Sequence, residues 1–125
     1  MNNQVLIVED CFIQSTVLKK ILESENFGVT AVCRSGDEAL DEVNKAKPDL
    51  ILMDIYLKGE MTGVQAVKKI REQSEVPVIF ITALNDSELF NDIQTIMNSG
   101  LLQKPVSKSD LVGALHSFIP EKAVA

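Results

Sequence analysis

The sequence has 125 residues, of which 46% are hydrophobic and 24% are charged, and these values are typical of one soluble globular domain. A net charge of −6 without any cluster of lysine and arginine argues against direct binding to nucleic acid. No apolar run approaches the roughly 20 residues of a membrane span, and the first residues lack the features of a signal peptide. We therefore expect a cytoplasmic protein that binds neither nucleic acid nor a membrane. The two cysteines, Cys11 and Cys33, form neither a zinc-binding nor a redox motif with the single histidine, His116.

Five apolar runs of strand length alternate along the chain with segments of helical periodicity. Three of these runs consist almost entirely of Val, Ile, Leu, Met and Phe, a pattern typical of parallel strands covered on both faces. In chain order, the predicted strands are Val5 to Val8, Val29 to Val32, Leu50 to Met53, Val76 to Ile81, and Leu101 to Leu102.

The first predicted helix runs from Phe12 to Glu25. Its apolar residues Ile13, Val17, Ile21 and Leu22 are expected to share one face.

Two further helices have the spacing of a capping box at their start. Ser35 and Glu38 open a helix that continues to Ala46 and stops before Pro48. Thr62 and Gln65 open the next helix, which places Val64, Val67 and Ile70 toward the core.

The last two helices have simpler start and stop signals. Asn85 or Asp86 is predicted to cap a helix that reaches about Asn98, with Gly100 as its terminator. Ser107 is predicted to cap a helix from Lys108 to Phe118, with Leu111, Val112 and Leu115 pointing inward.

Regular alternation of strands and helices indicates an α/β fold, in which helices cover both faces of a parallel sheet. In such sheets the functional site lies outside the carboxyl ends of the strands. Glu9 and Asp10 follow the first strand, Asp54 the third, Thr82 ends the fourth, and Lys104 follows the fifth. Each of these residues alone has an ordinary structural explanation, but the whole set at successive strand ends favours a functional site.

The three carboxylates predicted at this edge need a compensating cation, because their mutual repulsion is otherwise costly. Mg²⁺ suits oxygen ligands and retains several waters beside one or two carboxylates. A phosphoryl group would find Mg²⁺, the Lys104 ammonium and the Thr82 hydroxyl as partners, and a carboxylate such as Asp54 can be the nucleophile.

These segments resemble the receiver domain of bacterial two-component response regulators over essentially the whole chain. The matching features are Glu9 and Asp10 after the first strand, Asp54, Gly63 in the following loop, the segment from Pro77 to Ala83, and Lys104 with Pro105. The resemblance implies a flavodoxin-like, doubly wound five-stranded sheet of order 2-1-3-4-5 with five flanking helices. It also implies one receiver domain over residues 1–125, with its core at about 4–119, similar to single-domain chemotaxis and sporulation regulators.

The resemblance further implies a role for each site residue. Asp54 accepts the phosphoryl group, and Thr82 and Lys104 contact it. Mg²⁺, with Mn²⁺ as an alternative, is bound by Asp10, Asp54 and the Tyr56 carbonyl, while Glu9 acts through a metal-bound water. The peptide bond before Pro105 is expected to be cis.

Two positions depart from the pattern of the family. Leu101 occupies the position where an aromatic residue often takes part in the switch, so ring rotation cannot be the readout here. Tyr56 places a bulky side chain next to the acceptor, where it can shield the phosphoryl group from water.

Two other classes of protein agree less well with the sequence. A phosphohydrolase with an aspartyl nucleophile usually has a second Asp two residues after the first, whereas this chain has Tyr56. A flavodoxin-like FMN carrier needs a phosphate-binding loop after the first strand, whereas Glu9 and Asp10 would repel phosphate.

The sequence thus predicts a phosphorylation-activated switch and not an enzyme, with self-catalysed phosphoryl acceptance and slow autodephosphorylation only. Its expected partners are a sensor histidine kinase or phosphotransfer protein and a downstream protein. We expect a monomer or weak dimer without an attached output domain, either a stand-alone regulator or a receiver from a longer protein.

Overall fold

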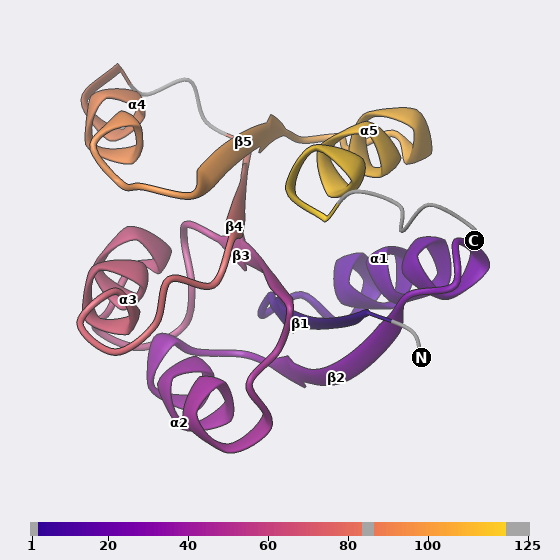
Figure 1. Ribbon diagram of the computed structural model, residues 1–125. Coiled ribbons are helices and arrows are strands. Elements are labelled where there is room, and N and C mark those ends of the chain that lie inside the picture. Colours follow the sequence, from indigo (N-terminus) through magenta and orange to yellow (C-terminus); the bar gives the residue numbers. More distant parts are fainter. Residues whose placement is uncertain (1–2, 84–86, 120–125) are drawn as a thin grey trace.

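The computed structural model describes residues 3–83 and 87–119, which form a five-stranded parallel sheet of order β2-β1-β3-β4-β5 (Figure 1). The strands are β1 (Gln4–Val8), β2 (Gly28–Cys33), β3 (Leu50–Asp54), β4 (Val78–Thr82) and β5 (Ser99–Gln103). The helices are α1 (Phe12–Ser24), α2 (Gly36–Ala46), α3 (Gly63–Ile70), α4 (Ser87–Gln94) and α5 (Lys108–Phe118). The predicted fold class and strand order are confirmed. No helix in this part of the chain has the length and apolar character needed to cross a membrane.

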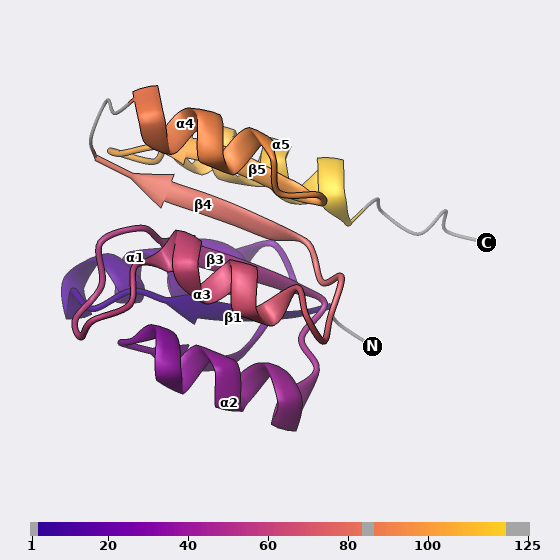
Figure 2. The same cartoon turned by 90° about the vertical axis from the view of Figure 1, so that its left-hand side faces the viewer.

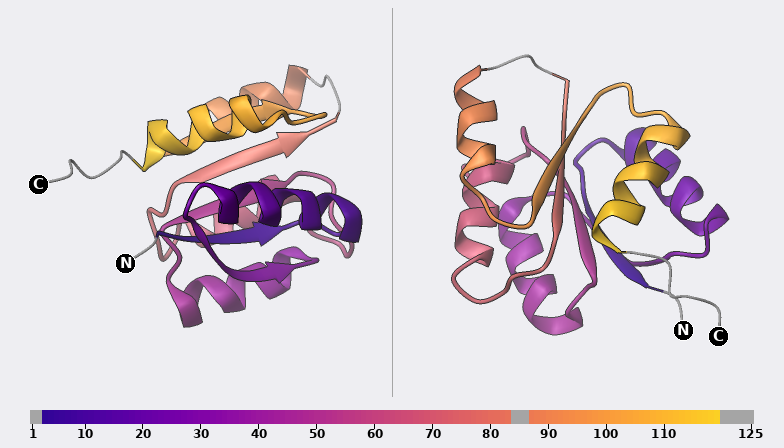
Figure 3. Two further views of the ribbon diagram at one scale, coloured as in Figure 1. Left: turned by 90° about the vertical axis from the view of Figure 1, so that its right-hand side faces the viewer. Right: turned by 45° about the horizontal axis from the view of Figure 1, so that its top comes forward.

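Helices cover the sheet on both faces, with α1 and α5 on one side and α2, α3 and α4 on the other (Figures 1, 2 and 3). Each side has its own apolar cluster. Leu22 and Leu111 pack against the sheet on the α1 side, and Val67 and Ile70 pack on the opposite side. All residues of β3 and β4 are buried, and only Gln4 of β1 is exposed, as expected for central strands between two helical layers.

The predicted starts of α1, α2, α3 and α5 agree with the structure, apart from one detail at α2. At α3 the Thr62 hydroxyl accepts from the Gln65 N–H and the Gln65 side chain accepts from the Thr62 N–H, which completes the capping box. At α2 the Ser35 hydroxyl accepts from the Glu38 N–H, but the Glu38 carboxylate accepts from the N–H of Arg34. The box at α2 is therefore only half formed.

The predicted inward face of α1 was partly wrong. Ile13 and Val17 are 73% and 51% exposed, whereas Ser15, Leu18 and Leu22 are the buried residues of this helix. The spacing of these three residues places them in one stripe along the helix, and of the residues predicted to point inward only Leu22 belongs to this stripe. Ile13 and Val17 belong to a neighbouring stripe, so the sequence contains two apolar stripes and the sheet covers only one.

The fourth helix ends earlier than predicted. α4 stops at Gln94, and the turn that follows contains Asn98 in a left-handed conformation with φ of 55°. Gly100, predicted as the terminator, lies within β5. The Ser99 hydroxyl donates to the carbonyls of Ile93 and Ile96 over 3.2 and 2.7 Å, so a side chain satisfies main-chain carbonyls at and just after the end of the helix. The predicted caps Asn85 and Asp86 lie outside the described residues.

Smaller differences affect β4 and α5. β4 begins at Val78 and not at Val76, because the intervening Pro77 has no N–H to donate to a neighbouring strand. In α5, Leu111 and Leu115 are buried as predicted, while Val112 is only partly buried. His116 is exposed on the same helix.

Candidate functional site

The carboxyl ends of four strands bring the predicted functional residues to one edge of the sheet. Glu9 and Asp10 follow β1, Asp54 is the last residue of β3, and Thr82 is the last residue of β4. Lys104 follows β5, and its N–H donates to the Thr82 carbonyl over 2.8 Å. Parallel pairing of β1 with β3 and of β3 with β4 fixes these neighbours, because all strand ends then face the same direction.

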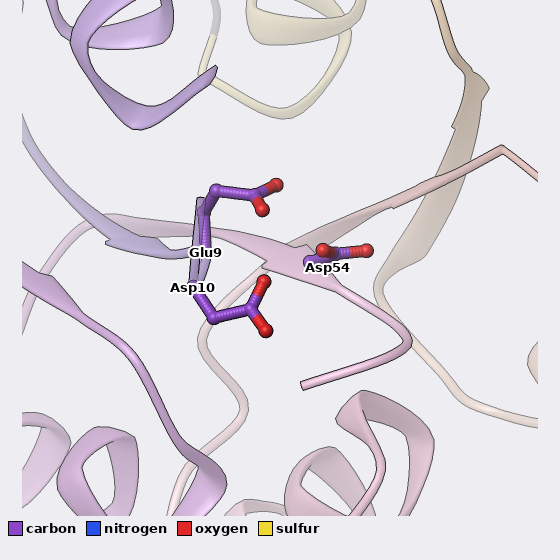
Figure 4. A group of neighbouring side chains, drawn as sticks. All are labelled: Glu9, Asp10 and Asp54. Carbon is purple, nitrogen blue, oxygen red and sulfur yellow. The ribbon is translucent and has the colours of Figure 1, made fainter. Parts of the chain in front are cut away.

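Three carboxylates converge at this edge and form an acidic cluster. One carboxylate oxygen each from Glu9, Asp10 and Asp54 lies within 4.8 Å of the others. Figure 4 shows the three carboxylate groups facing the same space, two from the end of β1 and one from the end of β3. Glu9 and Asp54 are only 3% and 6% exposed, whereas Asp10 is half-buried. Water therefore screens their mutual repulsion poorly, and a cation is favoured there.

The Lys104 ammonium lies against two of these carboxylates. Its Nζ is 3.2 Å from Glu9 Oε2 and 3.3 Å from Asp54 Oδ2. Burial lowers the pKa of Lys104, but the nearby charges of Asp54 and Glu9 outweigh it and leave this pKa above its ordinary value. The ammonium therefore stays protonated at neutral pH and neutralises part of the cluster.

Glu9 is held by more contacts than its sequence position suggested. Its Oε1 accepts from the Cys11 N–H over 3.1 Å, while its Oε2 pairs with Lys104. Burial, supported by the charge of Asp54, raises the pKa of Glu9, although the Cys11 N–H and Lys104 oppose this rise. The direct pair between Glu9 and Lys104 was not predicted, because no local pattern connects residues that are 95 positions apart.

The loop after Asp54 depends on the absence of a side chain at Gly63. The Gly63 N–H donates to the Ile55 carbonyl over 2.7 Å, which closes the loop. A Cβ atom at Gly63 would collide with the carbonyl oxygen of Asp54 and crowd Met53. Tyr56 lies in this loop two residues after Asp54, and its side chain is 45% exposed. Gly63 therefore keeps the main chain of Asp54 in place.

The donor set at this edge fits Mg²⁺. Carboxylate oxygens are the ligands that this ion prefers, and three of them meet without a histidine or thiolate ligand beside them in the cluster. Thr82, the last residue of β4, is 1% exposed. The Lys104–Pro105 peptide bond is cis, as predicted. Leu101 is 36% exposed on β5, so it is not a core residue.

A groove of about 450 Å³ adjoins the acidic cluster. Its walls include the exposed Ile13 and Val17 of α1 and, opposite them, Pro105 and Val106 after β5. Glu9 and Lys104 also line it, so an apolar surface continues directly into the charged site.

Comparison with known proteins links this arrangement to one family. Residues 5–116 match the model of the response regulator receiver domain. The transcriptional regulatory protein YdfI of Bacillus subtilis is 30% identical over 118 residues, which cover 94% of this chain and 55% of YdfI. The chain spans about half the length of the curated relatives it matches.

Solved structures show the same fold. The signal receiver domain of a modulated diguanylate cyclase from Desulfovibrio desulfuricans has a TM-score of 0.87 and 33% identity, covering 95% of this chain and 94% of that one. The receiver domain of the sensor histidine kinase PA1611 from Pseudomonas aeruginosa has a TM-score of 0.84 and 31% identity, covering 95% and 98%. That structure carries a magnesium ion coordinated in its active site cleft.

Proposed function

Because this chain belongs to the family of response regulator receiver domains of two-component signalling, we propose that it is a switch that accepts a phosphoryl group on Asp54. The observation that carries this proposal is the meeting of a buried Asp54 carboxylate with Lys104 and two further carboxylates at the strand ends. An ammonium and a metal-binding cluster beside one carboxylate are what phosphoryl transfer requires, since the protein mainly positions groups and neutralises charge.

In the proposed reaction a carboxylate oxygen of Asp54 attacks the phosphorus of a phosphohistidine. The bond between phosphorus and the histidine nitrogen breaks, the electron pair stays with the imidazole, and an acyl phosphate forms on Asp54. Lys104 stays beside the new phosphoryl oxygens, and the Thr82 hydroxyl donates to one of them. Mg²⁺, which would be held by Glu9, Asp10, Asp54 and the Tyr56 carbonyl, neutralises the charge of the phosphoryl oxygens when bound.

We further propose that the groove between α1 and the segment after β5 receives the phosphoryl donor. A sensor histidine kinase or phosphotransfer protein needs an apolar contact surface that leads to Asp54, and Ile13, Val17 and Val106 supply one. The chain is proposed to catalyse its own phosphorylation and slow dephosphorylation, with no turnover of outside substrates.

Incubation with acetyl phosphate and Mg²⁺ tests the acceptor. Mass spectrometry of the intact chain should show the gain of one phosphoryl group, and this gain should be absent when EDTA is present during the incubation. Asp54→Asn should show no gain, and Asp54→Glu should not restore it, because the longer side chain displaces the reacting oxygen. Asp92→Asn, on exposed α4, is the matched control and should label normally. Undiminished labelling of Asp54→Asn would refute the assignment.

Two further variants separate uptake from response. Lys104→Ala removes the ammonium that pairs with Asp54. Either phosphoryl uptake or the conformational change that follows it should therefore fail, while the fold is retained. Thr82→Ala should still be labelled, but its NMR spectrum should change less on phosphorylation than that of the wild type. A full wild-type set of shift changes in Thr82→Ala would contradict the role given to its hydroxyl.

A further inference from the structure

Away from the acidic cluster, one side chain connects α3 to the turn between α4 and β5. Arg71 follows the last residue of α3, and its guanidinium donates hydrogen bonds to three main-chain carbonyls. Nε and Nη2 donate to the Met97 carbonyl over 3.1 and 2.9 Å, and Nη2 also donates to Asn98 over 3.1 Å. Nη1 donates to the Ser74 carbonyl over 3.3 Å.

The carbonyls that Arg71 binds belong to two segments that also contact each other. The Asn98 carbonyl accepts from the N–H of Val78, the first residue of β4, over 2.9 Å. The Asn98 side chain donates to the Glu75 carbonyl over 3.0 Å. The turn formed by residues 95–98 is therefore fastened to the connection between α3 and β4, and Arg71 supplies most of the bonds.

Burial strengthens these contacts. Desolvation lowers the pKa of the Arg71 guanidinium, and the nearby Glu75 carboxylate opposes that shift. Hydrogen bonds from a charged donor that is partly removed from water are stronger than neutral ones. A lysine could not replace them, because a single ammonium lacks the planar fork that reaches several carbonyls at once.

By contrast, α4 itself is held loosely. Among its described side chains only Ile93 is buried, at 4% exposed, while Leu89 and Phe90 are half-buried. Figure 2 shows α4 running along β5, with its first residues toward the strand ends that carry Thr82 and its last residues toward the opposite edge. One end of α4 thus lies near the acidic cluster, and the other end leads into the turn that Arg71 holds.

From this arrangement we infer that Arg71 is a positioning residue that makes the α4–β5 turn a fixed pivot. With residues 95–98 held, a change at Thr82 can displace only the beginning of α4, and β5 keeps its register against β4. Without Arg71 the turn is held less firmly. The change at Thr82 then also displaces residues 95–98, so α4 and β5 do not adopt one new arrangement. The coupling to phosphorylation rests on the proposed function, whereas the fixed turn does not.

Amide hydrogen exchange of the unmodified protein tests the fixed turn. In Arg71→Gln, the amides of Val78 and Ile96 should exchange on the order of tenfold faster, because one binds the Asn98 carbonyl and the other lies in the turn. Arg71→Lys should give a smaller acceleration. Amides of the central strands, such as those of Ile7 and Leu52, should exchange at wild-type rates. Lys68→Gln is the control, since this exposed lysine of α3 lies one turn before Arg71 and has no ion pair among the described residues.

A uniform acceleration of all amides would mean that Arg71 contributes only to global stability, and unchanged rates at Val78 and Ile96 would mean that it holds nothing. Either result overturns the inference. Arg71→Lys keeps the test valid if the glutamine variant fails to fold.

Beryllofluoride, which mimics the phosphoryl group, tests the coupling by NMR. Chemical-shift changes near Asp54 should be equal in wild type and Arg71→Gln, while the changes at β5 and residues 95–98 should differ. Equal responses of both proteins at every residue would overturn the coupling. If the wild type itself does not respond, the proposed function is overturned, and the fixed turn is judged on the exchange rates alone.

Discussion

At the scale of single residues, Gly63 and Gly113 provide a matched pair. A methyl group at Gly63 would strike the Asp54 carbonyl, whereas a methyl group at Gly113, inside α5, meets nothing within 4 Å. Gly63→Ala should therefore lower the free energy of unfolding by about 1–3 kcal/mol and slow phosphoryl uptake, because the main chain of Asp54 must shift. Gly113→Ala should raise it by roughly 0.5–1 kcal/mol, because alanine favours the helix. Urea titration measures both, and equal effects of the two substitutions would contradict this explanation.

The buried thiol of Cys33 gives a second prediction at this scale. Burial, followed by the charge of Glu38, raises the pKa of Cys33 to about 12. A thiol in the unfolded chain ionises at about pH 8.5. The unfolded state therefore loses this proton at a lower pH than the folded state does. The free energy of unfolding of the wild type should fall as pH rises from about 8.5 toward 12. Cys33→Ala should show a shallower fall, measured by urea titration. At pH 9, iodoacetamide should modify Cys33 only after unfolding, whereas Cys11 is half-exposed and reacts in the folded chain.

At the scale of elements, α1 shows what the sequence could and could not predict. Its existence and start follow from periodicity, but the choice between two apolar stripes depends on which one the sheet covers, and that is a tertiary contact. The same limit applies to the end of α4, where Ser99, which lies outside the helix, donates its hydroxyl to the carbonyls of Ile93 and Ile96. Central strands were predictable because burial on both faces leaves almost no polar positions.

The two stripes of α1 should separate stability from partner binding. Leu22→Ala should cost about 2–5 kcal/mol in the free energy of unfolding, because Leu22 is fully buried. Val17→Ser should change it by no more than roughly 0.5 kcal/mol, since Val17 is 51% exposed. Under the proposed function, Val17→Ser should instead slow phosphotransfer from a cognate kinase, while labelling by acetyl phosphate stays normal. Equal slowing with both donors would place Val17 outside the docking surface.

At the scale of the whole molecule, the acidic cluster joins segments that lie far apart in the sequence. Which residue types would meet at the strand ends was predictable, because alternating strands and helices align those ends. The pair between Lys104 and Asp54 follows from the resemblance to receiver domains and is present. The pair between Lys104 and Glu9 was not predictable, because it depends on side-chain directions and burial. The Arg71 contacts were also missed, since they join a helix end to a distant turn through carbonyls that any residue supplies.

Under the proposed function, metal binding at this cluster should stabilise the entire fold, because the segment after β1 and the end of β3 would contribute ligands that the unfolded chain cannot bring together. At a Mg²⁺ concentration ten times its Kd, the free energy of unfolding should rise by about 1.4 kcal/mol. Asp10→Asn should lose most of this increment, and in EDTA it should be more stable than the wild type, because one of three repelling carboxylates is gone. Glu72→Gln, at an exposed position after α3, should keep the wild-type increment. Thermal unfolding with EDTA and with Mg²⁺ measures all three proteins. If Mg²⁺ raises the free energy of unfolding of Asp10→Asn as much as that of the wild type, Asp10 is not a ligand. If Asp10→Asn is less stable than the wild type in EDTA, repulsion does not destabilise the metal-free cluster.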